Sequence, residues 1–168
     1  MASATPIITI CDRDDREISS PWGVGTLDVN NGSAVPQSET KEIHIWNNKG
    51  GIESAADLVS SYITTKNING DNLNEQLVTD KWVQANYKNE SISALNGFHA
   101  IGGDDILEIC SDSATGIDKE NHVISGTANS GSTTDTSNFA TVRLKVVPKI
   151  NALKGLHQFK VRISGYYT

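Results

Sequence analysis

The sequence predicts an all-β fold, an antiparallel β-sandwich formed by a single domain. Apolar residues alternate with polar ones in short bursts, and this period of two is typical of strands with one buried face. Ser, Thr, Asn, Asp and Gly collect between the bursts, where turns are expected, whereas helix-favouring stretches of Ala, Leu, Glu and Lys are scarce. The 168 residues, 37% of them hydrophobic, suffice for one domain with a thin core between two sheets.

The first half of the chain supplies five expected strands. Residues 41–46 alternate most clearly, with Ile43 and Ile45 on one face and His44 and Trp46 on the other. The apolar spacing of residues 75–87 suits a helix as well as a strand, and a strand is favoured for 82–87. The five strands, separated by polar turns such as Asn-Asn-Gly-Ser at 30–33, are residues 6–11, 23–29, 41–46, 57–65 and 82–87.

The second half supplies five more strands: residues 98–101, 105–110, 122–127, 139–147 and 158–167. We expect the last two to form a closing hairpin across a proline-initiated crossover at 148–155. Their buried faces would be lined by Ala140, Val142, Leu144 and Val146 from one strand and by Phe159, Val161 and Ile163 from the other. Nine or ten short strands joined by turns are typical of an immunoglobulin-like sandwich or a jelly roll.

The domain is expected to span residues 1–168, with no linker or internal repeat. Residues 1–6 would form a short N-terminal arm, and the polar, low-complexity stretch 129–137 would form a flexible loop. The N-terminus has neither a basic region nor a long apolar run, and no apolar run approaches the roughly 20 residues that span a membrane. We therefore expect the protein to be made and folded in a cytoplasm.

The formal net charge of −6 bears on the choice of partner. An acidic chain is poorly suited to nucleic acid, which requires a basic patch, and to anionic membranes. We therefore expect neither nucleic acid nor a membrane as a partner, and we expect other proteins instead.

Motifs that carry chemistry are weak throughout the sequence. The four histidines stand alone in strand-like segments without the spacing of a zinc site, and residues 12–17 lack the layout of a calcium-binding EF-hand. The glycine pairs at 50–51 and 102–103 match no phosphate-binding loop and are interpreted as turn glycines. No nucleophile elbow is present, and Cys110 lies in an acidic stretch that does not activate a thiol. We expect no catalytic residue, no metal, no cofactor and no enzymatic activity.

The two cysteines and the tryptophans leave alternatives open. Cys11 and Cys110 each end an apolar strand, and they are interpreted as buried thiols in a reducing compartment, although a disulfide between facing strands is compatible with the sequence. Trp22 and Trp46 are candidate partner contacts or a sugar-stacking platform, and core packing is the alternative for both. If Ile43 and Ile45 are core residues, Trp46 faces outward or lies at a rim.

The order of motifs adds a resemblance that covers nearly the whole chain. The motifs are GVGTLDVNNGS, KEIHIWNNKGG, FHAIGGDD, HVISGTANS and FATVRLKVVPKINALKGLHQFKVRISGYY. This order resembles a group of small virion structural proteins of tailed bacteriophages and prophages, especially those of Gram-positive hosts. The polar loop at 129–137 is longer than in that group, which leaves any contact made by this loop undefined.

The resemblance implies a non-enzymatic virion protein, most directly a decoration protein that binds the outer surface of the major capsid shell. Its contacts would be Ile7 and Ile8 of the N-terminal stretch and the outward aromatic residues Trp22 and Trp46. The partner would be the major capsid protein or another virion protein, and self-association is compatible with this role. The alternatives are a tail, baseplate or neck component and a carbohydrate-binding adsorption module.

Overall fold

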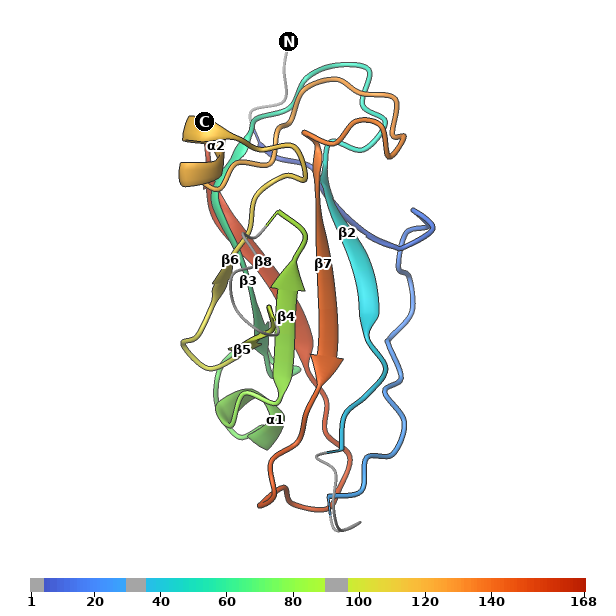
Figure 1. Ribbon diagram of the computed structural model, residues 1–168, viewed down its shortest axis with the longest axis vertical. Helices are drawn as coiled ribbons and strands as arrows, with labels where there is room; N and C mark the ends of the chain where they lie inside the picture. The colour runs from blue at the N-terminus through green and yellow to red at the C-terminus, as the bar shows by residue number, and fades with distance from the viewer. Residues whose placement is uncertain (1–4, 30–35, 90–96) are drawn as a thin grey trace.

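The computed structural model describes residues 5–29, 36–89 and 97–168, and it shows two antiparallel sheets packed face to face as a sandwich (Figure 1). The predicted all-β single-domain fold is confirmed. The larger sheet has the order β1 (Ile8–Asp12), β2 (Lys41–Asn47), β7 (Phe139–Val146), β4 (Val83–Tyr87) and β5 (His99–Ile101). The smaller sheet has the order β6 (Leu107–Glu108), β3 (Leu58–Lys66) and β8 (Lys160–Tyr167).

The core lies between the two sheets and follows the predicted alternation. Ile43 of β2 pairs with Val142 of β7, and Ile45 pairs with Ala140, so that these side chains share the inner face of the larger sheet. All four are at most 3% exposed. Across the core, Ile63 of β3 lies opposite the partly buried Ile163 of β8. Burial of the alternate positions therefore holds the two layers together.

The expected closing hairpin is wrong. β7 pairs with β2 and β4 in the larger sheet, whereas β8 pairs with β3 in the smaller one. The connection at 147–159 therefore crosses from one sheet to the other. Alternation predicts which face of a strand is buried, but both strands carry the same alternation, so the pattern does not specify which neighbours each one pairs with.

Three other expected strands differ from the structure. Residues 23–29 pair in no sheet, and Val24 and Leu27 pack against the core as partly buried residues. The expected strand at 122–127 is reduced to a single bridge between Leu58 and Ile124, and the one at 105–110 is shortened to β6. Ser60 and His122 both have positive φ angles, which interrupts regular pairing beside that bridge.

The ambiguous stretch at 75–87 contains both kinds of structure. Residues 83–87 form β4, as favoured, and they follow a single helical turn, α1 (Gln76–Thr79). A second short helix, α2 (Gly116–Glu120), precedes the crossing to β7. Among the described residues, no helix combines the length and apolarity needed to cross a membrane. The turn expected at 30–33 lies outside the described residues, as do residues 1–4 of the expected arm.

The two ends of the long axis are built differently (Figure 1). The upper end carries the loop 48–57 after β2 and the loop 125–138 before β7. The lower end carries α1 and the crossover between β7 and β8, of which residues 148–158 are called the lower-end loop below. These two ends expose most of the apolar side chains considered as contact surfaces.

Candidate functional site

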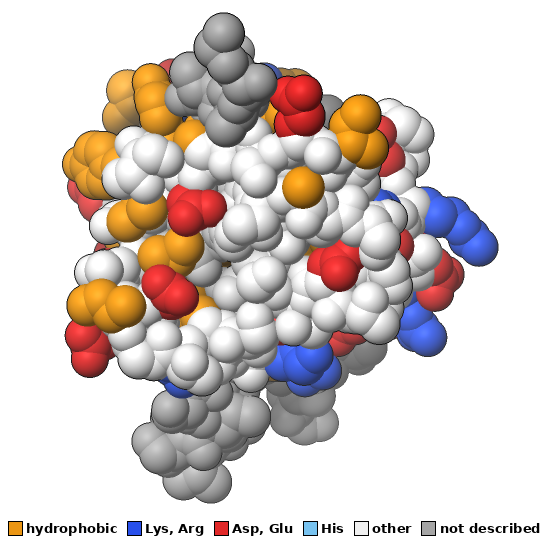
Figure 2. All heavy atoms as spheres, turned by 90° about the horizontal axis from the view of Figure 1, so that it is seen from above, with side chains coloured by type: hydrophobic (Ala, Val, Ile, Leu, Met, Phe, Trp, Pro, Cys, Tyr) orange, Lys and Arg blue, Asp and Glu red, His pale blue; other side chains and the backbone are white. Residues whose placement is uncertain are grey.

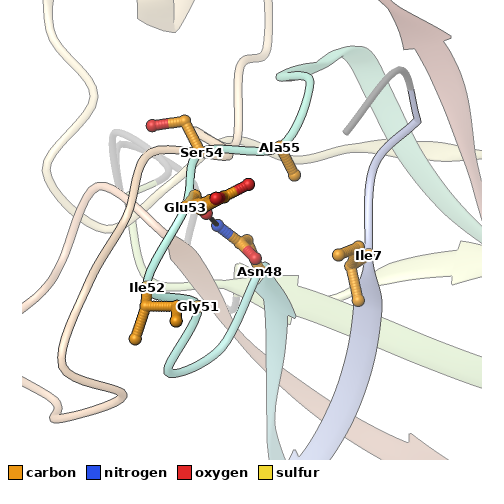
Figure 3. Close-up of a pocket in the computed structure, with 7 residues that line it drawn as sticks. All are labelled: Ile7, Asn48, Gly51, Ile52, Glu53, Ser54 and Ala55. Carbon is orange, nitrogen blue, oxygen red and sulfur yellow. Dashed lines mark hydrogen bonds between the residues drawn. The ribbon is translucent and has the colours of Figure 1, made fainter. Parts of the chain in front are cut away.

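The upper end contains an open hollow of about 330 Å³, called the upper-end hollow (Figure 3). Ile7 reaches it from just before β1, and the other walls come from the loop after β2. Ile7 and Ala55 point into the hollow from two sides, while Ile52 lies at the outer end of the loop. The described residues that line it are Ile7, Asn48, Gly51, Ile52, Glu53, Ser54 and Ala55.

Asn48 gives the hollow its shape. Its Nδ2 atom donates to the carbonyl oxygens of Glu53 and Gly126, both at 2.8 Å, and its backbone N–H donates to the carbonyl of Ile7 at 2.8 Å. Its φ angle of 61° turns the chain sharply, a conformation that asparagine tolerates better than most residues. A Cβ atom at position 51 would lie 2.1 Å from the Asn48 Oδ1 atom, so the close approach requires Gly51.

The chemistry of the hollow suits apolar contact. Ile7 is 49% exposed and Ile52 is 95% exposed, so two aliphatic side chains at this end face solvent. Glu53 is the one ionisable residue among the described residues that line the hollow. Such a surface can bind an apolar group of a partner beside a negative charge.

Ile8, the second predicted contact of the N-terminal stretch, begins β1 opposite Asn47 and is 39% exposed. The structure therefore places Ile7 and Ile8 at the surface of the upper end, side by side along the chain. Their role as contacts stays a prediction.

Trp46 lies in the interior. The prediction that its side chain faces outward as a partner contact is therefore wrong. Its side chain is fully buried, and its ring centroid lies 4.5 Å from that of Phe139 on the neighbouring strand. Together with Cys11, the two rings form a small cluster on the outer face of the larger sheet. The alternative of core packing therefore holds for this residue.

Polar residues cover this outer face, which explains why it is buried. Asp15 Oδ1 accepts hydrogen bonds from Trp46 Nε1 at 3.0 Å and from His44 Nδ1 at 2.7 Å. Lys49 Nζ donates to the Asp15 carbonyl and lies 3.3 Å from Cys11 Sγ. The acidic turn after β1, which the sequence did not assign to a calcium site, thus closes over the aromatic cluster.

The two thiols are buried and unbonded. Cys11 packs in the outer cluster, whereas Cys110 packs in the core between the sheets, and no disulfide joins them. Burial raises the pKa of both thiols above the usual value, even though Lys49 opposes the effect at Cys11 and Lys119 opposes it at Cys110. Both groups are therefore thiols rather than reactive thiolates near neutral pH.

Trp22 lies at a second, smaller hollow of about 250 Å³. Its ring meets Phe159 edge-on with centroids 6.4 Å apart, and Lys41 Nζ lies 5.8 Å from a Trp22 ring centroid. Carboxylates of Asp12, Glu39 and Glu42 line the same hollow. Because Trp46 is buried, the two tryptophans do not form one sugar-stacking platform.

The histidines are dispersed, as expected. His44, His122 and His157 each pair with a different carboxylate, those of Asp15, Glu108 and Glu75. Among the described residues, no group of three or more His, Cys, Asp or Glu side chains is arranged to hold a metal ion.

The polar loop at 129–137 is tied to the upper end by hydrogen bonds. Asn129 Oδ1 accepts from the Gly50 N–H at 2.9 Å, and Asn129 Nδ2 donates to the Asn48 carbonyl at 2.7 Å. Asp135 accepts from the backbone and the hydroxyl of Ser130, and these bonds lower the pKa of the Asp135 carboxyl. The loop therefore supports the wall behind the upper-end hollow.

The lower-end loop exposes three large aliphatic side chains that were not among the contacts predicted from the sequence. Ile150 is 92% exposed, Leu153 is 70% exposed and Leu156 is 85% exposed. The signal in the sequence was three aliphatic residues within a segment that begins with proline and contains glycine. Such residues in a crossover have no strand face to bury them.

A histidine anchors this loop. His157 Nδ1 lies 2.7 Å from Glu75 Oε1, and His157 Nε2 lies 2.9 Å from the carbonyl oxygen of Leu153. Burial alone lowers the pKa of His157, but these two acceptors favour the doubly protonated ring and raise it overall. Burial likewise favours a higher pKa for Glu75, yet the hydrogen bonds from His157 and from the backbone lower it overall.

Stability should therefore fall at high pH through the His157 anchor. A raised folded-state pKa means that the contribution of His157 is complete below its unfolded pKa, near 6.5, and is lost as the pH rises through the folded value. The lowered pKa of Glu75 means that its contribution is complete above 4.5 and is lost as the pH falls through its folded value. We expect His157→Gln to remove the loss at high pH, as measured by urea unfolding between about pH 5 and pH 9. Identical pH profiles for the variant and the wild type would contradict this role.

No known family model, curated protein sequence or solved structure matches this chain.

Proposed function

We propose that this protein is a non-enzymatic structural component of a tailed phage particle, most directly a decoration protein on the outer surface of the capsid shell. The observation that carries the proposal is the exposure of aliphatic side chains at the two ends of the sandwich, where hydrogen bonds hold the loops in place. Ile7 and Ile8 are the exposed aliphatic residues of the N-terminal stretch at the upper end. The resemblance of the motif order to virion structural proteins supports the same assignment.

The mechanism is stabilisation by binding to the assembled state. A protein that binds the assembled shell, and not its separate subunits, shifts the equilibrium toward the shell. Each contact can be weak, because the contacts of many copies on one particle add up to stabilise the shell. A rigid sandwich suits this role, since little conformational entropy is lost when its ends bind.

Ile8→Asp is expected to weaken binding to empty capsid shells by at least about tenfold, because it places a charge on an apolar contact. Binding is measured by co-sedimentation of the purified protein with shells. Ile68→Asp is the matched control, since Ile68 is 51% exposed in the turn after β3, away from the upper end. Equal binding by both variants would remove Ile8 from the contact.

The location in the particle is tested separately. Microscopy of intact particles should find density for the sandwich on the shell while the tails remain bare. Density on the tail, baseplate or neck would replace the decoration role with that of a tail component. Binding to cell-wall glycans that is lost in Trp22→Ala would favour the adsorption module instead.

A further inference from the structure

The lower-end loop presents an apolar surface that stays exposed among the residues that the structure describes. Ile150, Leu153 and Leu156 are 92%, 70% and 85% exposed within seven residues. Exposed clusters of large aliphatic side chains generally mark binding surfaces. The protruding loop lies at the opposite end of the long axis from the upper-end hollow (Figure 1).

The loop is held in place and does not need to be ordered by its partner. The Leu153 N–H donates to Gln76 Oε1 at 2.7 Å, and Gln76 Nε2 donates to the Asn151 carbonyl at 3.2 Å. His157 anchors the far side of the loop to Glu75. A surface ordered in advance loses less conformational entropy on binding.

The two ends also differ in charge. The lower-end loop contains Lys149 and Lys154 and no acidic residue. At the upper end, Glu53 lines the hollow, and the face seen from above carries Asp and Glu side chains across it, with Lys and Arg mostly toward its margin (Figure 2). The lower-end loop itself is basic and apolar, and the nearby carboxylates of Glu75 and Asp80 are bound by His157 and Gln76. The loop is therefore complementary to the acidic upper end with its apolar hollow.

We propose that the lower-end loop of one copy binds the upper-end hollow of a second copy, so that the protein associates head to tail. Ile7 and Ala55 would receive aliphatic side chains of the loop, and Lys149 and Lys154 would face the acidic upper end. Because the two surfaces lie at opposite ends, the contact is heterologous. An assembly of any length therefore keeps an unoccupied hollow at one end and an unoccupied loop at the other, and further copies can add. This inference does not depend on the virion role, since it concerns the isolated protein.

Two variants test the contact from each side. Leu153→Asp with Leu156→Asp blocks the loop, and Ile7→Asp with Ile52→Asp blocks the hollow. The substituted side chains are 49–95% exposed, so the fold should be retained, which thermal unfolding verifies. In sedimentation velocity, the wild type should form species that grow with concentration, while each variant alone should associate at least about tenfold more weakly.

Mixing the two variants provides the decisive measurement. Each keeps one intact surface, so the mixture should form a one-to-one complex that grows no further. Raised salt should weaken association of the wild type, and the variant Lys149→Glu with Lys154→Glu should associate more weakly than the wild type at low salt. Ile106→Asp should leave association unchanged, since Ile106 is 46% exposed beside the middle of β3, away from both ends.

Three outcomes would overturn the proposal: a wild type that stays monomeric up to about 1 mM, a blocked variant that alone associates as strongly as the wild type, or a mixture that stays monomeric. Failure here is distinct from failure of the decoration role, because shell binding is measured with Ile8→Asp and needs no contact between copies.

Discussion

Trp46→Ala should lower the free energy of unfolding by about 3–5 kcal/mol, the range for removing a large aromatic side chain from a core. The side chain is fully buried against Phe139 and Cys11, so truncation leaves a cavity on the outer face of the larger sheet. The substitution also removes the Nε1 donor to Asp15, which helps to hold the turn after β1 over the cluster. The effect is measured by equilibrium unfolding in urea.

Trp22→Ala is the matched control for this prediction. Trp22 is only partly buried, and its ring contact with Phe159 is edge-on at 6.4 Å. We expect a smaller loss of about 1–2 kcal/mol, because less apolar area is removed from the interior. If Trp46→Ala left the free energy of unfolding unchanged and weakened shell binding instead, Trp46 would be a surface contact after all.

The sequence predicts the face of Trp46 correctly but not its burial. Alternation places Trp46 on the face opposite Ile43 and Ile45, and the register confirms this. The outer face of a sandwich is normally solvated, and that expectation fails here because Asp15, from another part of the chain, closes over the ring. A local pattern does not contain a contact between residues 31 positions apart.

The same limit explains which strands could be predicted. β2 and β7 alternate clearly and lie side by side inside the larger sheet, so the period of two sufficed to find them. Residues 23–29 alternate too, yet they pack beside the core without pairing. The pairing of β8 with β3 rather than β7 depends on the path of the crossover, which no residue pattern specifies.

The upper-end hollow was only partly predictable. Ile7 was predicted as a contact from its place in the N-terminal stretch, whereas the other walls depend on the positive φ angle of Asn48 and on its bond to Gly126, 78 residues away. The aliphatic residues of the lower-end loop could have been found from the sequence alone. Whether these residues form a contact surface or pack together under the loop depends on the structure, because the sequence does not show how exposed they are.

Asn47→Asp should lower the free energy of unfolding by about 3–5 kcal/mol at neutral pH, although the two side chains have nearly the same shape. Asn47 is fully buried at the end of β2. Its Nδ2 atom donates to the carbonyls of Ala56 and Ile124 at 2.9 and 3.0 Å, while its Oδ1 atom accepts from the Ile7 N–H at 3.0 Å. Aspartate keeps the acceptor but turns a carboxylate oxygen toward two carbonyl oxygens and buries a charge without a counterion.

The pH dependence separates this cause from a simple packing defect. A buried carboxylate facing carbonyl oxygens has a raised folded-state pKa, so the loss should shrink as the pH falls and the protonated side chain donates to one carbonyl. Asn69→Asp, at an exposed turn position, should change the free energy of unfolding by less than about 0.5 kcal/mol. A loss at Asn47 that is equal at pH 7 and at about pH 4 would show that packing, and not the lost donor and the buried charge, governs this position. Because Asn47 binds Ile7, Ala56 and Ile124 together, the same substitution should also loosen the upper-end hollow and weaken head-to-tail association.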